Sequence, residues 1–274
     1  MKSTKLIVKN LRDYYGRQLG LRDVNRRIKK RLKLDWEQKC LRKLSEYIDI
    51  KNKTLLDVGT GWGGTLMLAE KMGAKATGVE PDKDLVEITK QRKKDFRLKY
   101  KIYEGVGEKL KFKDNSFDIV TSLAVLEHTK KPNKVINEMI RVLKPGGYCY
   151  IACPNYCFPR ENHYKIFFIP SCPKWLAKIH LSIIGRPTKF IEHLKYVNPY
   201  KIIRQLKKHK VKIYNIAEQK MLGNGFFFYP EEVKSKKVKL ILNMIKSSRI
   251  DKLYGFFAKY IKIYPSTMIL VKKK

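Results

Sequence analysis

The sequence predicts an α/β fold, with a mostly parallel β-sheet that carries helices on both faces. From Thr54 onward, short apolar runs alternate with helical segments, as in repeated strand–helix–strand units. A glycine-rich turn, GTGWGG at 59–64, joins the first apolar run to the first helical segment. The 274 residues are 43% hydrophobic, which suffices for one full α/β domain with insertions and excludes global disorder.

Apolar runs, helical periodicity and boundary signals define the individual elements. The predicted strands are 54–58, 75–80, 100–104, 117–123, 147–153, 211–217 and 264–271. The predicted helices are 63–72, 83–94, 133–143 and 199–209. Proline with Asp or Asn marks three helix beginnings, at Pro81-Asp82, Pro132-Asn133 and Asn198-Pro199. Lys144-Pro145-Gly146-Gly147 ends a helix and leads directly into a strand.

Two kinds of segment lie outside this strand–helix rhythm. Residues 1–50 have helical patterning and predict an N-terminal helical cap in front of an α/β domain at 51–274. Two long excursions, 154–197 and 218–262, each follow the end of a strand. Because α/β folds bind substrates at these strand ends, we expect both excursions to act as helical lids over the acceptor.

The net charge of +36 is unevenly distributed. Residues 54–155 carry 18 Lys and Arg against 13 Asp and Glu, whereas residues 156–274 carry 26 against 6. Residues 1–53 carry 17 against 6. Basic flanks attract anionic partners such as nucleic acid, acidic membranes or phosphorylated substrates, but a lysine-rich composition with solvated charges explains them equally well. The charge alone therefore does not name a function.

The turn at 59–64 is the most informative motif. Its glycines at 59, 61 and 64 fit G-x-G-x-x-G, which serves nicotinamide adenine dinucleotide and S-adenosylmethionine alike. Asp57 separates the two ligands, because a carboxylate ~4 Å from a diphosphate would cost about 4 kcal/mol at an effective dielectric constant of about 20. Beside the ammonium group of a methionine moiety the same charge is attractive. Glu80, at the end of the second predicted strand, can accept both ribose hydroxyls of either ligand.

These residues lie within a longer series of motifs. The stretches are LLDVGTGWGG, TGVEPD, GEKLKFKDNSFDIV, LAVLEH and RVLKPGGYCYIACPN, in this order between Leu55 and Asn155. In sequence and spacing they resemble the class I S-adenosylmethionine-dependent methyltransferases, in the branch that contains ubiquinone- and menaquinone-biosynthesis enzymes. The resemblance implies a Rossmann-like seven-stranded sheet of order 3-2-1-4-5-7-6, S-adenosylmethionine as the cofactor and methyl transfer as the activity.

The resemblance also assigns cofactor-binding positions. The implied contacts are Asp57, Gly59 and Gly61 for the methionine moiety, Glu80 for the ribose, Pro81, Gly107 and Glu108 for the adenine, and Leu123 for a backbone contact after the fourth strand. The chain departs from the family at Val106, where an Asp is common. We therefore expect Glu108, or the backbone around Gly107, to contact the adenine instead.

Histidines are the first candidates for the base that an oxygen acceptor requires. His128 follows the fourth predicted strand, and His163 lies in the polar cluster Arg160–Tyr164 just after a strand end. We take both as candidate catalytic bases, with an ordering role for His128 as the alternative. Glu127-His128 is at most half of a metal site, because no second ligand pair has matching spacing, so no metal is predicted. The five cysteines are expected to be reduced and structural.

The acceptor is less well determined than the cofactor. The segment TSLAVLEH lacks the N-P-P-aromatic motif of amine methylation, and no Pro-Cys nucleophile is present. A looser resemblance over 154–210 favours O-methylation of a small-molecule, glycan or lipid-linked acceptor. The alternatives are an RNA or protein methyltransferase that uses its basic flanks, and a non-catalytic S-adenosylmethionine-binding protein.

The chain shows no apolar N-terminal leader and no run long enough to span a membrane, so we expect a cytoplasmic protein. Residues 237–261 mix Leu, Ile and Phe with Lys and Arg. Such a segment either packs as a lid on the sheet or lies peripherally on an anionic membrane. The oligomeric state is not predicted.

Overall fold

The computed structural model describes residues 1–219, 264 and 266–274. Within this part of the chain, seven strands form the main sheet: β1 (Thr54–Val58), β2 (Lys75–Glu80), β3 (Lys101–Glu104), β4 (Phe117–Leu123), β5 (Leu143–Pro154), β8 (Val211–Asn215) and β9 (Ser266–Lys273). The helices that follow its strands are α4 (Gly64–Lys71), α5 (Lys83–Asp95), α6 (Pro132–Val142) and α9 (Pro199–Leu206). All seven predicted strands and four predicted helices are confirmed, with ends that shift by a few residues.

The sheet order is β3-β2-β1-β4-β5-β9-β8, with the first five strands parallel and β9 antiparallel to both of its neighbours. Because β6 and β7 form a separate hairpin, β8 and β9 are the sixth and seventh strands of the main sheet, and the order is the predicted 3-2-1-4-5-7-6. The register places Asp57 of β1 beside Gly78 of β2 and Thr121 of β4. The strand order reverses beside β1, between β1 and β4, where open α/β sheets bind their ligands.

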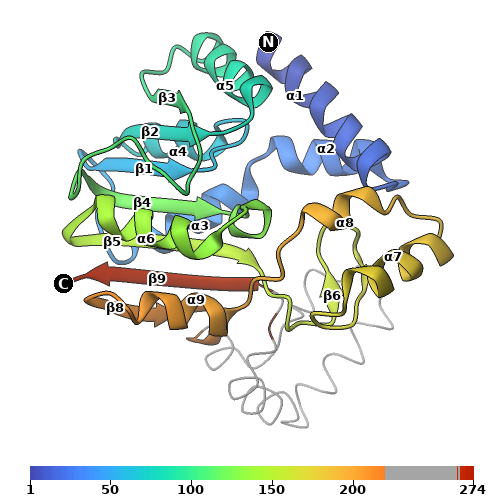
Figure 1. The fold of residues 1–274 in the computed structure, drawn as a ribbon. Coiled ribbons are helices and arrows are strands. Elements are labelled where there is room, and N and C mark those ends of the chain that lie inside the picture. The colour runs from blue at the N-terminus through green and yellow to red at the C-terminus, as the bar shows by residue number, and fades with distance from the viewer. Residues whose placement is uncertain (220–263, 265) are drawn as a thin grey trace, which may run out of the picture.

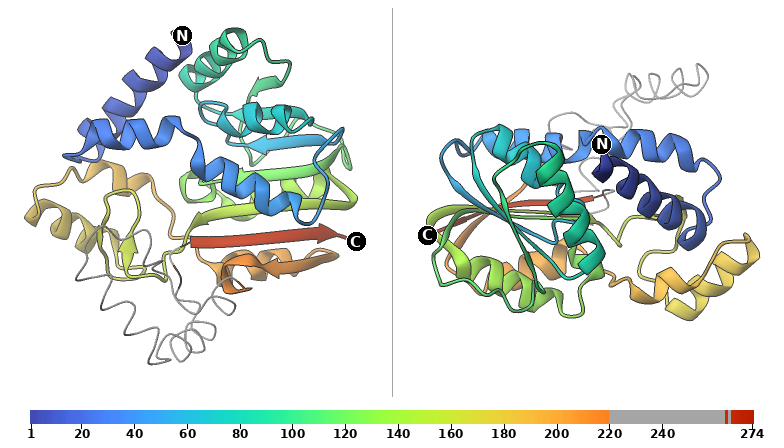
Figure 2. Two further views of the ribbon diagram at one scale, coloured as in Figure 1. Left: turned by 180° about the vertical axis from the view of Figure 1, so that it is seen from behind. Right: turned by 90° about the horizontal axis from the view of Figure 1, so that it is seen from above.

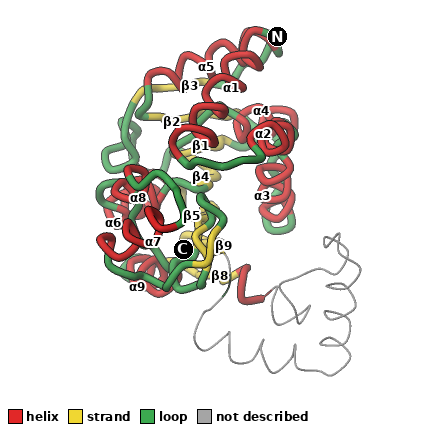
Figure 3. Tube along the Cα trace, turned by 90° about the vertical axis from the view of Figure 1, so that its right-hand side faces the viewer, coloured by secondary structure: helices red, strands yellow, loops and turns green. Residues whose placement is uncertain are grey.

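Strand alternation divides the core between the two faces of the sheet (Figure 3). On one face Leu55, Ile119 and Leu270 pack with α4 and with α3 (Asp35–Ser45). On the other face their chain neighbours Leu56 and Val120 pack with α6 and α9. Both faces are therefore covered, and the carboxyl-end edge of the parallel strands remains for ligands.

The first 50 residues form helices α1 (Lys2–Arg12), α2 (Val24–Leu32) and α3, with a π-helix at Asp13–Gln18 between the first two. Helix α1 lies along α5, where the backbone N–H and the hydroxyl of Ser3 both donate to Asp95 at 2.7 Å. Figures 1 and 2 show α1 and α2 beyond the carboxyl-end edge of the sheet. The predicted N-terminal cap thus stands beside the cofactor turn.

The first excursion is ordered and partly buried. It contains a small hairpin of β6 (Arg160–Glu161) and β7 (Ile166–Phe167), followed by α7 (Lys174–Ile183) and α8 (Lys189–His193). Its side chains Phe168, Leu181 and Ile191 belong to the same buried cluster as β4 and β5. The second excursion, with the amphipathic stretch 237–261, lies almost entirely outside the described residues. Within the described residues, no helix combines the length and the apolar character needed to cross a membrane.

Candidate functional site

The turn after β1 brings backbone close to a ligand position. Gly59, Gly61 and Gly63 all have positive φ, the left-handed region that glycine adopts without strain. A Cβ at Gly59 would lie 2.6 Å from Val125, whereas a Cβ at Gly61 would meet nothing within 4 Å. Gly59 is therefore required for packing, and Gly61 is the glycine that faces open space.

Asp57, the last residue but one of β1, lies beneath this turn with only 2% of its surface exposed. The hydroxyl of Thr121, its neighbour across the sheet, donates to Asp57 Oδ1 at 2.6 Å. Burial raises the pKa of Asp57 to about 6, and the Thr121 hydroxyl opposes that rise. At neutral pH the side chain is therefore mainly ionised, and a cation beside it would recover the lost solvation.

Glu80, at the end of β2, is also buried and faces the same turn. Its Oε2 accepts the backbone N–H of Gly61 at 2.8 Å, and its Oε1 accepts that of Asp82 at 3.2 Å. Burial raises the pKa of Glu80, and these two N–H groups lower it. Each carboxylate oxygen keeps a lone pair, so two ribose hydroxyls can still donate to it.

The remaining predicted cofactor residues follow β2, β3 and β4. Pro81 is exposed directly after β2, and Leu123 is the half-buried end of β4. Gly107 fits closely, because a Cβ there would lie 2.9 Å from Val58. Glu108 Oε1 accepts the backbone N–H of Lys131 at 3.1 Å, so in this structure it ties the loop to the beginning of α6.

The N-terminal cap holds the outer side of the glycine turn. Trp62 Nε1 donates to Asn10 Oδ1 at 3.0 Å, and the Arg31 guanidinium lies 5.2 Å from the Trp62 ring centre. Arg31 also pairs with the buried Glu37, and Arg92 donates to the Trp62 carbonyl at 2.9 Å. None of these contacts was predicted, because the sequence does not indicate which face of the cap meets the turn.

A second cluster begins directly after the segment that contains Val125, the side chain that packs on Gly59. The short 3₁₀-helix Leu126–His128 presents Glu127 and His128, and the first excursion brings His163 and Glu161 to them. The His128 and His163 rings are edge to face, with centroids 5.2 Å apart. The two candidate bases are thus neighbours, although 34 residues separate them in the chain.

The two carboxylates of this cluster are in opposite states. Glu161 is fully buried and accepts from Tyr164 N at 2.6 Å, and its Oε1 lies 2.6 Å from His163 Nδ1. Burial alone would raise the pKa of Glu161, but His163 and the backbone N–H groups outweigh it and the pKa is lowered. Glu127 is also fully buried, and neither of its oxygens has a hydrogen-bond partner within the described part of the chain. Burial raises the pKa of Glu127 to about 7.

An aromatic side chain packs against both histidines, although His128 remains exposed to solvent. Phe190 of α8 lies with its ring centre 5.4 Å from that of His163 and 6.0 Å from that of His128. Tyr14 of the cap reaches the same Phe190 at 5.5 Å. Partial burial, and then the charge of His163, lower the pKa of His128. Cap and excursion therefore meet over the histidine cluster, and the sequence offers no signal for that contact.

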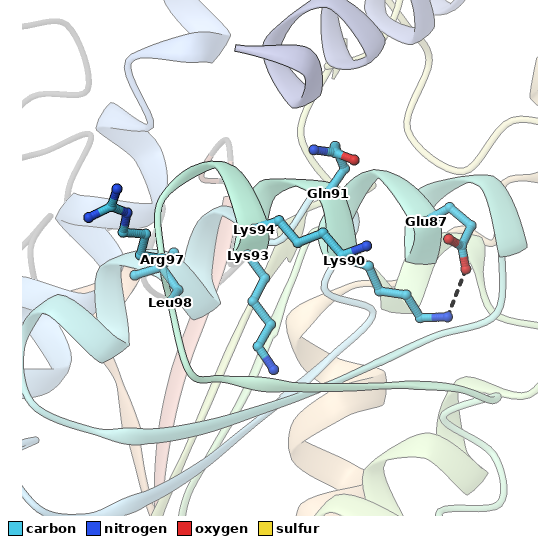
Figure 4. A pocket seen from close by; sticks show the side chains of 7 residues that line it. All are labelled: Glu87, Lys90, Gln91, Lys93, Lys94, Arg97 and Leu98. Carbon is cyan, nitrogen blue, oxygen red and sulfur yellow. Dashed lines mark hydrogen bonds and ion pairs between the residues drawn. The ribbon is translucent and has the colours of Figure 1, made fainter.

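Other sequence features lie away from these two clusters. His209 contacts Asn137 at 2.9 Å near the far edge of the sheet, and His180 lies on α7. A hollow of about 410 Å³ follows the outer side of α5, between Lys90 and Arg97 (Figure 4). Its lining does not include any residue of the strand-end turns, so it is separate from the predicted cofactor position.

Comparison with known proteins agrees with this arrangement. Residues 56–151 match a family described as a methyltransferase domain. The chain is 26% identical over 157 residues to a ubiquinone biosynthesis O-methyltransferase of Hydrogenovibrio crunogenus, covering 57% of this chain and 61% of that protein. It is 32% identical over 121 residues to a sterol 4-C-methyltransferase of Caenorhabditis elegans, covering 42% of this chain and 36% of that protein. The chain thus spans about half the length of these relatives.

A solved structure has the same fold. Phosphoethanolamine N-methyltransferase 2 of Haemonchus contortus, in complex with phosphomonomethylethanolamine and S-adenosylhomocysteine, superposes with a TM-score of 0.55 at 16% identity. The match covers 100% of this chain and 58% of that one. The match over 56–151, the strand order and the acidic residues beside the glycine turn agree with one another. Together, the match to a methyltransferase-domain family over residues 56–151, the relatives and the fold support a methyltransferase of the class I S-adenosylmethionine-dependent type.

Proposed function

We propose that the protein transfers a methyl group from S-adenosylmethionine to a hydroxyl of a small-molecule, glycan or lipid-linked acceptor. The observation that carries the cofactor half is the pair of buried carboxylates, Asp57 and Glu80, beneath a turn whose Gly61 faces open space. Asp57 would hold the ammonium group of the methionine moiety, and Glu80 the ribose hydroxyls. Gly107 and Glu108, in the loop after β3, would face the adenine.

The cofactor residues fit this ligand better than a dinucleotide. An ionised Asp57 supplies attraction for a cation, whereas a diphosphate at the same turn would be repelled by it. When bound, S-adenosylmethionine supplies an electrophilic methyl group: its S–CH₃ bond breaks as the acceptor oxygen forms the new C–O bond, and the hydroxyl proton passes to a base. The protein's task is then to align the acceptor, exclude water and accept that proton.

We assign the acceptor side to the cluster of His128 and His163. Three features support this assignment: the cluster directly follows the segment that packs on the glycine turn, it contains two imidazoles, and the Phe190 ring packs against both of them while His128 stays open to solvent. His163 is oriented by Glu161 through its Nδ1, the arrangement that fixes a catalytic imidazole. A hydroxyl acceptor needs such groups because, unlike an amine, it must lose its proton as it is methylated.

Calorimetry with S-adenosylmethionine tests the cofactor site. Asp57→Ala and Glu80→Ala should each weaken binding by at least about tenfold, because each loses a charge-assisted contact. Glu87→Ala is a matched control, since Glu87 is an exposed carboxylate that pairs with Lys90 on the outer side of α5, away from the glycine turn. Parent-like binding by both site variants would show that the assigned position is wrong.

Incubation of metabolite and lipid extracts with methyl-labelled cofactor tests the acceptor. Label in a small or lipid-linked product is expected, and with that acceptor His163→Ala should lower kcat much more than it raises KM. Label that appears only in RNA or protein would favour the alternative acceptor class. Cofactor binding without transfer to any extract would favour a binding protein instead.

A further inference from the structure

Three potential metal ligands converge at the strand ends. One donor atom each from Glu127, His128 and His163 lies within 4.8 Å of the other two. Glu127 and His128 come from the segment after β4, and His163 comes from the excursion after β5. The set cannot be recognised from spacing along the chain, because His163 belongs to a loop whose path the sequence does not predict.

Glu127 supplies an independent indication that something binds here. Its side chain is 0% exposed, and within the described part of the chain both oxygens lack a hydrogen-bond partner. Burying an unpartnered carboxylate is costly, and proteins normally pair such groups or use them as metal ligands. The Nε2 atom of His128 lies 3.9 Å from Glu127 Oε1, which is too far for a hydrogen bond.

Glu161 prepares His163 for the same role. It occupies His163 Nδ1 at 2.6 Å, which leaves Nε2 as the nitrogen that can ligate. Carboxylate–histidine pairs of this kind fix the tautomer and orientation of metal-binding imidazoles. Glu161 is itself held by Tyr164 N and by the Tyr156 hydroxyl, so the pair is rigid.

From these contacts we propose that Glu127, His128 and His163 bind one divalent transition metal ion, most suitably Zn²⁺. Two imidazoles and one carboxylate match the donor set of catalytic zinc sites, and imidazoles disfavour Mg²⁺ and Ca²⁺. A three-ligand site leaves an open position for an exogenous oxygen. This assignment replaces the sequence-based expectation of no metal.

The role of the ion rests on the proposed function. A divalent cation held there would lower the pKa of the acceptor hydroxyl, so that its proton would be lost to bulk solvent as the acceptor binds, before water is excluded and the oxygen takes the methyl group. The C–O bond forms as the S–CH₃ bond breaks, and no electrons are exchanged with the ion. In this role His128 and His163 act on the hydroxyl through the metal rather than as free bases.

Metal content of the full chain tests the site directly. Protein stripped with a chelator, loaded with Zn²⁺ and passed through a desalting column should retain about one zinc ion per chain. His128→Ala and His163→Ala should lose it, and Glu161→Gln should weaken zinc affinity by about 10- to 100-fold. His209→Ala is the matched control and should retain the ion, because His209 lies away from the cluster. Circular dichroism establishes that each variant is folded.

Two results would overturn the proposal: no retained zinc in the parent, or equal zinc in the parent and in both folded histidine variants. Co²⁺ in place of Zn²⁺ checks the donor atoms, because a thiolate charge-transfer band would point to cysteine ligands and against this site. Calorimetry with S-adenosylmethionine separates the two proposals. A protein that binds zinc but not the cofactor refutes the proposed function alone, and one that methylates an acceptor without retaining zinc refutes the metal site alone.

Discussion

Four carboxylates buried at the strand ends differ in the partners that surround them. Asp57 has the hydroxyl of Thr121, Glu80 has two backbone N–H groups, and Glu161 has a histidine and a backbone N–H. Glu127 has no hydrogen-bond partner in the described residues. Burial is similar in all four, so the hydrogen-bond partners determine how well each negative charge is compensated. Glu161 is compensated by His163, whereas Glu127 is left to be compensated by a bound cation.

The raised pKa of Asp57 makes cofactor affinity dependent on pH. Its carboxyl group has a pKa of about 6 and is therefore ionised above that pH and neutral below it. Since only the ionised form attracts the methionine ammonium group, affinity for S-adenosylmethionine should be constant above about pH 7. It should fall by up to about tenfold per pH unit below 6. Calorimetry between pH 5 and 8 measures this (about one unit per step suffices).

Asp57→Asn provides the comparison for that experiment. The variant should bind weakly at every pH, with the step near pH 6 removed. A step of the same size in the variant would place the responsible proton on another group, such as Glu80, whose pKa is also raised by burial.

Glu127 and Glu161 should respond in opposite ways to the same substitution. In metal-free protein, Glu127→Gln removes a buried charge without partners and should raise the free energy of unfolding by about 1–3 kcal/mol. Glu161→Gln breaks a charge-assisted contact with His163 and should lower it by about 1–3 kcal/mol. Urea unfolding in the presence of a chelator measures both. A loss of stability in both variants would mean that Glu127 has a partner after all.

At the scale of elements, the N-terminal cap (residues 1–50) and the first excursion (residues 154–197) together cover the strand ends. We call this covering layer the roof. They meet where Tyr14 packs on Phe190 and where Gly20 lies against Pro187. Leu19 and Leu21 of the cap belong to the same buried cluster as Leu181 and Ile191 of the excursion. The two segments are therefore coupled by packing, and Phe190, where they meet, packs against the histidine cluster.

Gly20 tests how closely the two segments fit. It has φ +60°, and a Cβ there would lie 2.7 Å from Pro187 Cδ. Gly146 has φ +75°, but a Cβ there would meet nothing within 4 Å. Both Ala variants incur the backbone penalty of about 1 kcal/mol, and Gly20→Ala should lose roughly a further 1–3 kcal/mol from overpacking. Equal urea midpoints for the two variants would contradict a tight contact.

The regular elements could be predicted because their signals are local. Strand β1 and strand β2 were predicted to the residue, since each is a short apolar run between turn-forming residues. The Asp82 and Asn198 caps are also local, and each side chain accepts the expected backbone N–H groups. The first excursion was predicted only as a helical lid. The bounds of α7 and α8 and the β6–β7 hairpin were not predicted, because their burial depends on tertiary contacts with the cap and with α6 and α9.

The same distinction applies to the candidate site. Asp57 and Glu80 could be placed because a strand end and a glycine turn fix them relative to one another. The contact between His128 and His163 could not, because it depends on the path of the first excursion. The proposed metal site meets the same limit: chain spacing shows only the adjacent Glu127 and His128, and the fold brings His163 to them.

Across the whole molecule, the net charge of +36 should itself oppose folding. Basic residues gather near the roof: Arg27, Lys30 and Arg160 each lower the pKa of Lys165, after the larger effect of burial, and Glu161 opposes them. Repulsion of this kind acts over the Debye length, which falls from about 30 Å at 0.01 M salt to about 10 Å at 0.1 M. The balanced middle of the chain contributes little to it, so most of the repulsion comes from the basic flanks at 1–53 and 156–274.

Thermal unfolding at increasing sodium chloride tests this. Between 0.01 and 0.1 M the midpoint should rise, by roughly 2–4 °C for each kcal/mol of repulsion removed. Sucrose at matched osmolality separates screening from general solvent effects, because it leaves the Debye length unchanged. A midpoint that stays constant or falls would show that the acidic residues already compensate the basic ones locally. The excess charge would then be free to serve an anionic acceptor without a stability cost.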